Sequence, residues 1–436
     1  MKDPTCSEVW QNPDWKKQNV LLCAGQPQVM QVLTDWNNFT SEEQLRRIKT
    51  NAGPIYVTQQ PDNKYVCPER GLYEYTVNGH NKTQELNYHS ESFQTNKALF
   101  SYPEDDAFLD GYKAGKKILD NYRKNAEKIS HNYFKAELRR EYFQPAIAEI
   151  WQTWYGLPDG KTLLPESWSW KRIVDVISQT DPATVARTHA VCPGDFMAPS
   201  RGSVFPRPSE AIRDFAQMHG KAILKAGREF VALHRTNVNL PKTRLIAQLF
   251  KVTSDDEVLA RNIIGTMIGA IPPMDANLRN ILFEWIDTGR LWRHQAAFKT
   301  ALKGKTVEGN LAGAMDSLRT PVSQAMCLRP APDMLFRTAK RTTRIARSKG
   351  NDISSKLDGA WTHEGDMVLV SLVSASQQSL HNDPTGRSGI DVIFGGKRVA
   401  VPQGYELKDG KDKPGQNPNS NLPVHACPAQ KWLWAG

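Results

Sequence analysis

The stretch 254–287 constrains this chain more than any other, because it predicts a long helix whose surroundings must be apolar. It begins with Ser254-Asp255-Asp256-Glu257, a capping-box sequence in which Ser254 accepts from the Glu257 amide and the Glu257 side chain reaches back. The acidic first turn also suits the helix dipole. Apolar residues then occupy much of the helix circumference, so we expect this helix to be central in the fold. They are Val258, Leu259, Ile263, Ile264, Met267, Ile268 and Ile271.

Two adjacent prolines fall inside this predicted helix. Pro272 and Pro273 lack amide hydrogens, which removes two backbone donors and deprives the carbonyls of Ile268 and Gly269 of their helical partners. The sequence alone leaves two interpretations open. One is a pair of helices joined by a Pro-Pro corner. The other is a single central helix that kinks or opens where a ligand or cofactor packs, with small residues at Gly269 and Ala270 that allow close approach.

The composition excludes several classes of protein. The chain has 436 residues and a net charge of +10, with 39% hydrophobic and 23% charged residues, which does not fit a collagen-like, disordered or coiled-coil chain. Its longest nearly uncharged apolar stretch, Ile263 to Ile271, is much shorter than the roughly 20 residues of a membrane span. The basic run from Arg337 to Lys349 has no interleaved aromatic residue for stacking on bases. We therefore expect no membrane span and no nucleic-acid partner.

The six cysteines form no framework. No CxxC pair occurs, and none of the ten histidines stands at zinc-finger spacing from two cysteines. The N-terminus, MKDPTCSEVW, lacks the apolar core of a secretory signal. Reduced thiols in a cytoplasmic protein are therefore the expected state, most of them acting as small buried hydrophobes. The cysteines are Cys6, Cys23, Cys67, Cys192, Cys327 and Cys427.

The organisation along the chain is mainly α with a minor β part. No internal repeat and no linker divides it, so a single domain over 1–436 is expected. The sequence 51–66 predicts a β-hairpin around a Pro-Asp-Asn turn, 366–373 predicts a buried strand, and the stretch from Gly386 to Pro423 has a coil-like composition. The expected parts are a polar, β-containing part at 1–100, a helical part at 100–300 with the central helix 254–287, and a strand and cysteine-loop part at 320–436.

Three segments, in this order along the chain, resemble the haem-thiolate proteins of the cytochrome P-450 superfamily. The helix 262–286 is similar to the long helix that crosses the haem face in that family. MCLRPAPDMLFRTAKRT (326–342) and GDMVLVSLVSAS (365–376) resemble the ExxR helix, the Pro-rich turn, the Arg-bearing strand and the strand after it. PVHACPAQK (423–431) resembles the loop whose cysteine ligates haem iron. The resemblance implies a multihelical fold with a small β region and a haem b cofactor.

The resemblance also implies a role for each matching residue. Cys427 would be the axial thiolate and the only protein ligand of the iron, and such a thiolate favours cleavage of an O–O bond. His425 and Arg337 would bind the haem propionates, the arginine through a charge-assisted contact. Arg329 stands at the position of the ExxR arginine and would anchor the loop before the cysteine.

The central helix departs from the family pattern. Gly269 and Ala270 would lie over the haem, but the acid–alcohol pair that usually delivers protons to bound dioxygen falls at Pro272 and Pro273. Peroxygenase or hydroperoxide-rearranging chemistry survives this loss better than reductase-driven hydroxylation, because a peroxide brings its own O–O bond and both electrons. The Gly-Ala-x-x-Pro pattern is also similar to the P-450 domain of fatty-acid diol synthases, which carry amides just past the proline. Asn277 is the nearest amide here and is a catalytic candidate.

The other two segments depart as well. Met326 occupies the position of the ExxR glutamate, so that buried ion pair cannot form in its usual way. Ser420, Pro423 and Ala429 replace the aromatic residue and the two glycines around the cysteine, where glycine normally permits tight turns. Only nine residues follow Cys427, too few for the further core helix and final hairpin of the family, so the C-terminal part of the fold is expected to be truncated.

Two classes of function follow from these observations. The first is a haem-thiolate oxidoreductase of the monooxygenase, peroxygenase or hydroperoxide isomerase class, acting on an apolar, fatty-acid-like substrate and favouring a peroxide over O₂ and a reductase. An acidic electron-transfer partner, if used, would dock on the basic run after Arg337, although a solvated face is the simpler interpretation of that run. The alternatives are a conventional monooxygenase and a catalytically degenerate binding protein of the same fold.

Overall fold

The structure of the chain is a computed structural model, and its described residues belong to two compact units. The first unit comprises Met1–Gln44 and Ala276–Gln430, and the second comprises Leu45–Asp275 and Lys431–Gly436. The expectation of one domain over the whole chain stays a prediction. The described residues are 6–11, 19–35, 38–40, 58–59, 65–66, 98, 102–131, 133–135, 138–155, 227–235, 244–252, 254–345, 360–396 and 427.

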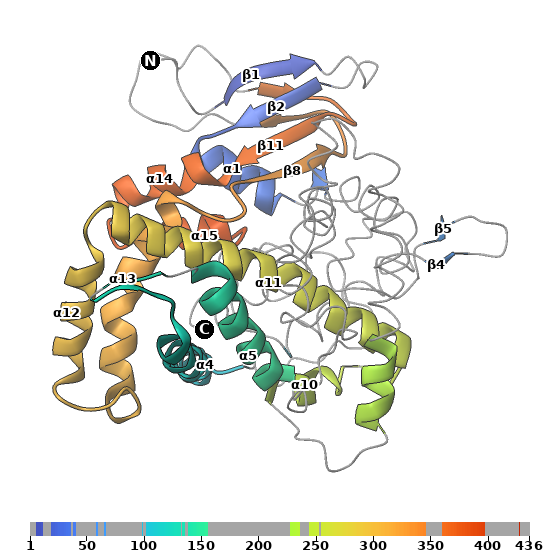
Figure 1. The fold of residues 1–436 in the computed structure, drawn as a ribbon. Helices are drawn as coiled ribbons and strands as arrows, with labels where there is room; N and C mark the ends of the chain where they lie inside the picture. The colour runs from blue at the N-terminus through green and yellow to red at the C-terminus, as the bar shows by residue number, and fades with distance from the viewer. Residues whose placement is uncertain are drawn as a thin grey trace. The chain divides into compact units, whose positions relative to one another are not determined.

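A five-stranded sheet forms the β part of the first unit (Figure 1). Its strands follow the order β1-β2-β11-β8-β3, so segments from both ends of the chain share one sheet. Neighbouring strands are antiparallel except for β11 and β2, which are parallel. The strand predicted at 366–373 is β11, which ends at Ser371 because a helix begins there. The strands are β1 (Cys6–Gln11), β2 (Asn19–Cys23), β3 (Phe39–Thr40), β8 (Met334–Ala339) and β11 (Met367–Ser371).

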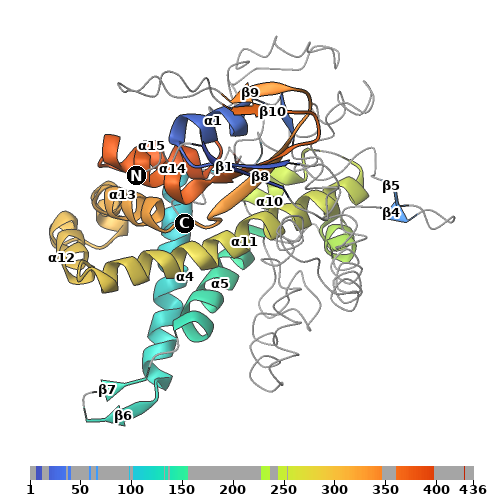
Figure 2. The same cartoon turned by 90° about the horizontal axis from the view of Figure 1, so that it is seen from above.

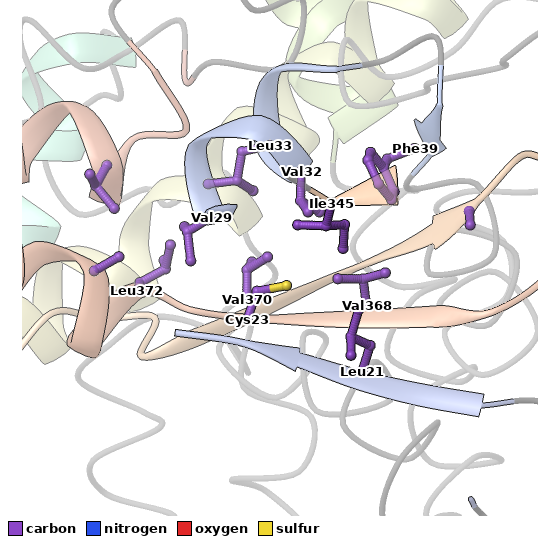
Figure 3. Packing of buried hydrophobic residues seen from close by; sticks show 13 residues of the cluster. Leu21, Cys23, Val29, Val32, Leu33, Phe39, Ile345, Val368, Val370 and Leu372 are labelled. Atoms are coloured by element: carbon purple, nitrogen blue, oxygen red, sulfur yellow. The ribbon is translucent and has the colours of Figure 1, made fainter. Parts of the chain in front are cut away.

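Helix α1 (Gln26–Thr34) packs against this sheet and forms its apolar core (Figure 3). Leu21 and Cys23 of β2 are two residues apart, as are Val368 and Val370 of β11, so each pair points to the same face. These four side chains are buried against the apolar face of α1, and burial of apolar surface is the main stabilising contribution. The residues that α1 contributes are Val29, Val32 and Leu33, and all three are buried.

The remaining elements of the first unit follow helix α11 (Asp256–Asp287) along the chain. Helices α12 and α13 pack as an antiparallel pair, and α14 and α15 pack against each other and against α13. Two short strands, β9 and β10, form a separate antiparallel pair. The elements are α12 (Leu291–Leu302), the 3₁₀ turn η6 (Glu308–Asn310), α13 (Leu311–Leu328), β9 (Thr343–Ile345), β10 (Ala360–Thr362), α14 (Leu372–Asn382) and α15 (Arg387–Ile393).

Helix α15 corrects the expectation of coil from Gly386 onward. The Asp383 carboxylate accepts hydrogen bonds from the Ser388 amide and hydroxyl at 3.0 and 3.1 Å, which satisfies donors at the start of this helix. Its glycine Gly389 also allows a close approach to α13, since a Cβ at that position would lie only 2.3 Å from the Cys327 Sγ atom. The remainder of the expected coil, beyond residue 396, lies outside the described residues.

The second unit contains the predicted hairpin and the helices before α11. Strands β4 (Thr58–Gln59) and β5 (Tyr65–Val66) are antiparallel partners, which confirms the hairpin expected within 51–66. Figure 2 shows the β6–β7 hairpin at the end of α4. The other elements are α4 (Glu104–Asn125), β6 (Lys128–Ser130), β7 (Tyr133–Phe134), the π-helical turn η3 (Arg139–Phe143), α5 (Gln144–Tyr155) and α10 (Arg244–Leu249).

Aromatic residues of α5 form a buried cluster in this second unit. Trp151 and Trp154 are buried with their ring centroids 5.4 Å apart in an edge-to-face pair, and Trp151 stacks on Tyr155 at 5.2 Å. The indole N–H of Trp154 donates to the Asp110 carboxylate at 3.2 Å, and the Tyr102 hydroxyl donates to the same oxygen. The polar edge of this aromatic cluster therefore meets a hydrogen-bond acceptor from α4.

Helix α11 (Asp256–Asp287) is the predicted central helix, and its 32 residues run without interruption through Pro272 and Pro273. A corner between two separate helices is therefore excluded. The predicted capping box is wrong by one residue, because the Glu257 amide donates to the Asp255 carboxylate at 3.0 Å rather than to Ser254. The Glu257 carboxylate accepts two hydrogen bonds from Arg228, at 2.6 and 2.8 Å.

Candidate functional site

The structure describes four of the seven predicted site residues with their side-chain environment. Arg329, Arg337, Asn277 and Cys427 all belong to the first unit. Gly269 and Ala270 lie on the helical backbone of α11, within the second unit. His425 lies outside the described residues. Where the structure places the four described residues decides what chemistry they are able to support.

The end of α13 is held by side chains from two other helices. The last four carbonyl groups of an α-helix have no partner within the helix. Here three successive carbonyls at that end accept hydrogen bonds from side chains of α14 and α11. They are Cys327 O from Ser376 Oγ at 2.8 Å, Leu328 O from Gln377 Nε2 at 3.0 Å, and Arg329 O from Asn280 Nδ2 at 2.9 Å. The segment that joins α13 to β8 is therefore fixed from both sides.

Asn277 contributes to the same anchorage. Its side-chain amide donates to the Ala331 carbonyl at 2.9 Å, and its carboxamide oxygen accepts from the Ala331 amide at 3.0 Å. Both ends of the carboxamide are thus engaged with one residue of the backbone, just before the cis peptide bond between Ala331 and Pro332. This geometry gives Asn277 a positioning function, while its predicted catalytic function is not tested by it.

Arg329 makes ion pairs with two acids of α11 that the sequence did not point to. Its Nε lies 3.1 Å from a Glu284 oxygen, and its Nη2 lies 2.9 Å from an Asp287 oxygen. The side chain of Glu284 is only 9% exposed, whereas that of Asp287 is 55% exposed. The arginine at the ExxR position therefore does find a buried acid, but from α11 and not from Met326 of its own helix.

These contacts define one polar stripe along the second half of α11. Its members are spaced by three or four residues, which places them on one face of the helix, and all of them bind residues between Arg329 and Ala331. We call this set the α11 stripe; it consists of Asn277, Asn280, Glu284 and Asp287. The spacing was visible in the sequence as polar residues at helical intervals, but nothing there identified the segment that they bind.

Arg337 is a buried cation on β8. It stands opposite Val368 of β11. It is two residues from Leu335 and two residues from Ala339, so it belongs with them to the face of the sheet that carries the apolar core. The residue is 8% exposed, and burial lowers the pKa of its guanidinium to about 10. A guanidinium is chemically suited to bind a carboxylate through charge-assisted hydrogen bonds.

Cys427 is linked to the first unit through its backbone. Its amide donates to the Phe394 carbonyl at 2.8 Å, and Phe394 follows directly after α15. The residue is partly buried. Sequence reasoning missed this contact because thirty-odd residues separate the two positions and no pattern connects them. Cys427 and the end of α15 are therefore neighbours in the fold.

Cys327, on α13, is a buried cysteine. Burial, with a smaller contribution from Asp383, raises the pKa of the Cys327 thiol to about 12. Its Sγ lies 3.4 Å from the Gly386 carbonyl, which it approaches as a donor. Cys327 therefore stays a protonated thiol at neutral pH and is not suited to ligate a metal, since only the thiolate is a good ligand.

The described part of the chain contains neither a cluster of metal-binding side chains nor a helix suited to span a membrane. Among the residues described, no group of three or more His, Cys, Asp and Glu side chains is placed to hold a metal ion. Within the same residues, no helix combines the length and the apolar character that crossing a membrane requires.

Comparison with known proteins identifies the fold. No family model matches the chain, and no curated protein matches it. Among solved structures, the crystal structure of a cytochrome P450 (CYP102L1) is similar, with a TM-score of 0.58 and 11% sequence identity over 100% of this chain and 86% of that chain. At this identity the likeness shows the fold alone. The fold is therefore cytochrome P450-like, mainly α with a small β region, as the sequence predicted.

The described donor set fits a haem in its chemistry. A haem offers an iron, which binds a thiolate, and propionates, which bind guanidinium groups. Arg337 would provide the second kind of contact through its guanidinium, and Cys427 would provide the sulfur. The fit rests on these two residues, since His425 is outside the described residues.

Proposed function

We propose that this chain is a haem-thiolate oxidoreductase that acts on an apolar substrate. The observation that carries the proposal is the position of Cys427, whose amide donates to the Phe394 carbonyl, in a chain with a cytochrome P450-like fold. Arg337 supports the proposal, because it belongs to the same unit of the fold and its guanidinium is chemically suited to bind a propionate.

Each residue of the proposed site has one task. Cys427 would hold the iron, Arg337 and His425 would bind the propionates, and Arg329 would keep the segment before β8 in place. When bound, a haem with a thiolate ligand supplies the chemistry of O–O bond cleavage. The resemblance would give Gly269 and Ala270, two small residues of α11, the task of leaving room for the ring and for substrate.

We further propose that the oxidant is a peroxide and that the substrate is fatty-acid-like. Pro272 and Pro273 occupy the positions where an acid and an alcohol would deliver protons, and a proline side chain has no proton to donate. A peroxide or lipid hydroperoxide already contains the reduced O–O bond, so it depends less on such delivery. The similarity of the Gly-Ala-x-x-Pro pattern to fatty-acid diol synthases supports a lipid hydroperoxide as the substrate class.

The absorption spectrum of the reduced protein with carbon monoxide tests the haem-thiolate site. Protein reconstituted with haem is expected to show the strongly red-shifted Soret band of a thiolate ligand. Cys427→Ala should abolish that band, whereas the matched control Cys327→Ala should retain it, because Cys327 is a protonated buried thiol. A wild-type protein without the band despite haem supply, or a Cys427→Ala protein that keeps it, would contradict the proposal. Colourless protein that binds a lipid would favour the degenerate binding protein instead.

A comparison of oxidants tests the subclass. The haem-loaded protein is incubated with a fatty acid and hydrogen peroxide, with a fatty-acid hydroperoxide, or with a fatty acid, reduced nicotinamide and a reductase. We expect product in one of the first two mixtures. Turnover only in the third would overturn the peroxide preference and identify a conventional monooxygenase that uses an electron-transfer partner.

A further inference from the structure

We infer that Glu284 is a positioning residue of the proposed haem site. From α11, it binds Arg329 in place of the acid that would stand on α13, where this chain has Met326. Its carboxylate holds Arg329 and thereby the segment from which β8 and Arg337 continue. The ion pair itself is an observation of the structure. The part of the inference that concerns haem rests on the proposed function, and the experiment below separates the two.

The first step concerns what α13 cannot provide. Met326 is buried, with 5% exposure, and stands three residues before Arg329. A thioether is at most a weak acceptor, so it cannot balance a guanidinium charge. Arg329 follows the last residue of α13 and keeps a side chain that is 45% exposed. An acid for this arginine must therefore come from another element.

The second step distinguishes the two acids that do reach Arg329. Glu284 is nearly buried, and Asp287 is more than half exposed. An ion pair with a buried carboxylate is screened less by solvent, and loss of its charge is felt more strongly than at a surface pair. The two acids stand one helical turn apart and bind different nitrogens of the same guanidinium, at 3.1 and 2.9 Å. Asp287 is therefore a matched control for Glu284.

The third step follows the chain from Arg329 to Arg337. Asn280 and Asn277 fix the backbone of Arg329 and Ala331. The Asp333 carbonyl then accepts from the Leu372 amide at 2.9 Å, and β8 begins at the next residue. Arg337 thus stands eight residues after Arg329, and hydrogen bonds hold Arg329, Ala331 and Asp333 along that path. A change at Glu284 is therefore transmitted to the strand that carries the proposed propionate ligand.

The experiment compares three variants of the full chain: Glu284→Gln, Asp287→Asn, and Glu284→Gln combined with Met326→Glu. Glutamine keeps the shape of the side chain and removes only its charge. We expect Glu284→Gln to speed haem dissociation at least fivefold and to convert part of the thiolate Soret band to a shorter-wavelength form, while Asp287→Asn stays within twofold of wild type. In the double variant, the new acid three residues before Arg329 should restore both values to within twofold.

The restoration distinguishes positioning from a general loss of packing, because a second buried change in a merely weakened core would add damage. Equal effects of Glu284→Gln and Asp287→Asn, or failure of Met326→Glu to restore haem retention in a folded double variant, would overturn the inference. If the double variant does not fold, a double-mutant cycle of Glu284→Gln and Arg329→Gln replaces it. We expect strong non-additivity in haem dissociation, and additive effects would overturn the inference.

The thermal midpoint of the haem-free protein separates this inference from the proposed function. A wild-type protein that takes up no haem would contradict the proposed function. In that case the same variants are ranked by thermal midpoint. The ion-pair part of the inference then predicts a larger decrease for Glu284→Gln than for Asp287→Asn and its recovery on adding Met326→Glu, and a different ranking would overturn it.

Discussion

The two halves of α11 are anchored in different ways. In the second unit, the first turn of the helix is held by charged residues of the helical segment 227–235: Arg228 binds Glu257 bidentately, and Arg235 binds Asp256 at 2.9 Å. In the first unit, the second half is held by the α11 stripe. Its side-chain amides bind the backbone of Arg329 and Ala331, and its buried Glu284 binds the Arg329 side chain.

The two sets differ in how strongly solvent weakens their main interactions. The side chains of Arg228 and Glu257 are 54% and 38% exposed, so water and salt screen their attraction. The stripe acts on a segment that carries backbone groups needing partners, where a lost hydrogen bond leaves a polar group unsatisfied. Surface charge therefore orients the start of the helix, and the stripe fixes the segment next to the proposed haem site.

The largest effect is expected from Asn277→Ala. This change removes two hydrogen bonds at once and leaves both backbone groups of Ala331 without their acceptor and donor. We expect a loss of about 2 to 4 kcal/mol in the free energy of unfolding. Chemical denaturation of the full chain measures it. The matched control is Asn280→Ala, which removes one bond to Arg329 O in a more exposed place and should cost about 1 kcal/mol.

The ratio of these two effects decides whether the stripe acts as described. Equal losses for Asn277→Ala and Asn280→Ala would mean that the bidentate bond to Ala331 contributes no more than a single exposed one. A loss below about 1 kcal/mol for Asn277→Ala would remove the contrast between the two halves of α11.

The sequence predicted helices and strands better than it predicted the contacts between them. The central helix, the strand β11 and the hairpin within 51–66 follow from local periodicity and turn residues, and each is confirmed. The pairing of Arg329 with Glu284 joins positions 45 residues apart, and no local rule specifies which acid an arginine finds across a fold. Met326 indicated only that the usual acid was missing.

The errors of sequence reasoning have the same origin. The Glu257 side chain of the predicted capping box binds Arg228 of a separate segment, and local sequence does not specify such a contact. Helix α15 was missed because it has only seven residues, too few for periodicity to be decisive. The predicted functions of Cys427 and His425 come from resemblance alone and stay predictions.

A smaller effect is expected at the first turn of α11. Arg228→Ala removes an exposed bidentate ion pair with Glu257. Arg235→Ala removes a single ion pair with Asp256 and a cation–π contact with Phe250 at 5.0 Å. Each change should cost about 0.2 to 1 kcal/mol, decreasing as salt is raised. Unfolding titrations at low and high salt measure both terms. The difference between the two halves would be contradicted if Arg228→Ala lowered the free energy of unfolding as much as Asn277→Ala does. It would also be contradicted if salt left the effect of Arg228→Ala unchanged.

The smallest effects are expected from two histidines that neighbour the two halves. His234, in the segment 227–235, lies with its ring 3.8 Å from the Phe230 ring centroid and 5.5 Å from that of Phe250. His294, on α12, lies 5.0 Å from the Trp285 ring. Burial lowers the pKa of His234, and a hydrogen bond with the Phe230 carbonyl opposes this. Burial also lowers the pKa of His294, with the charges of Arg290 and Arg293 acting in the same direction.

Both shifts have the same sign for stability. The folded state binds the histidine proton less tightly than the unfolded chain, in which the histidine pKa is about 6.5. The contribution of each neutral histidine to the free energy of unfolding is therefore complete above about pH 6.5. It is lost as the pH falls from there through the lowered folded pKa. The causes differ, however, since desolvation is insensitive to salt and the effect of two neighbouring arginines is not. We expect high salt to raise the pKa of His294 toward its ordinary value and to leave that of His234 in place.

Imidazole proton shifts, followed by NMR against pH at low and high salt, test this expectation, with His234→Gln and His294→Gln assigning the two signals. A His234 pKa that rises with salt as much as that of His294 would contradict it. The result would sharpen the comparison of the two halves. Close to the half of α11 that exposed charges anchor, the neighbouring histidine is governed by aromatic burial. Close to the half that the stripe anchors, the histidine is the one that responds to surface charge.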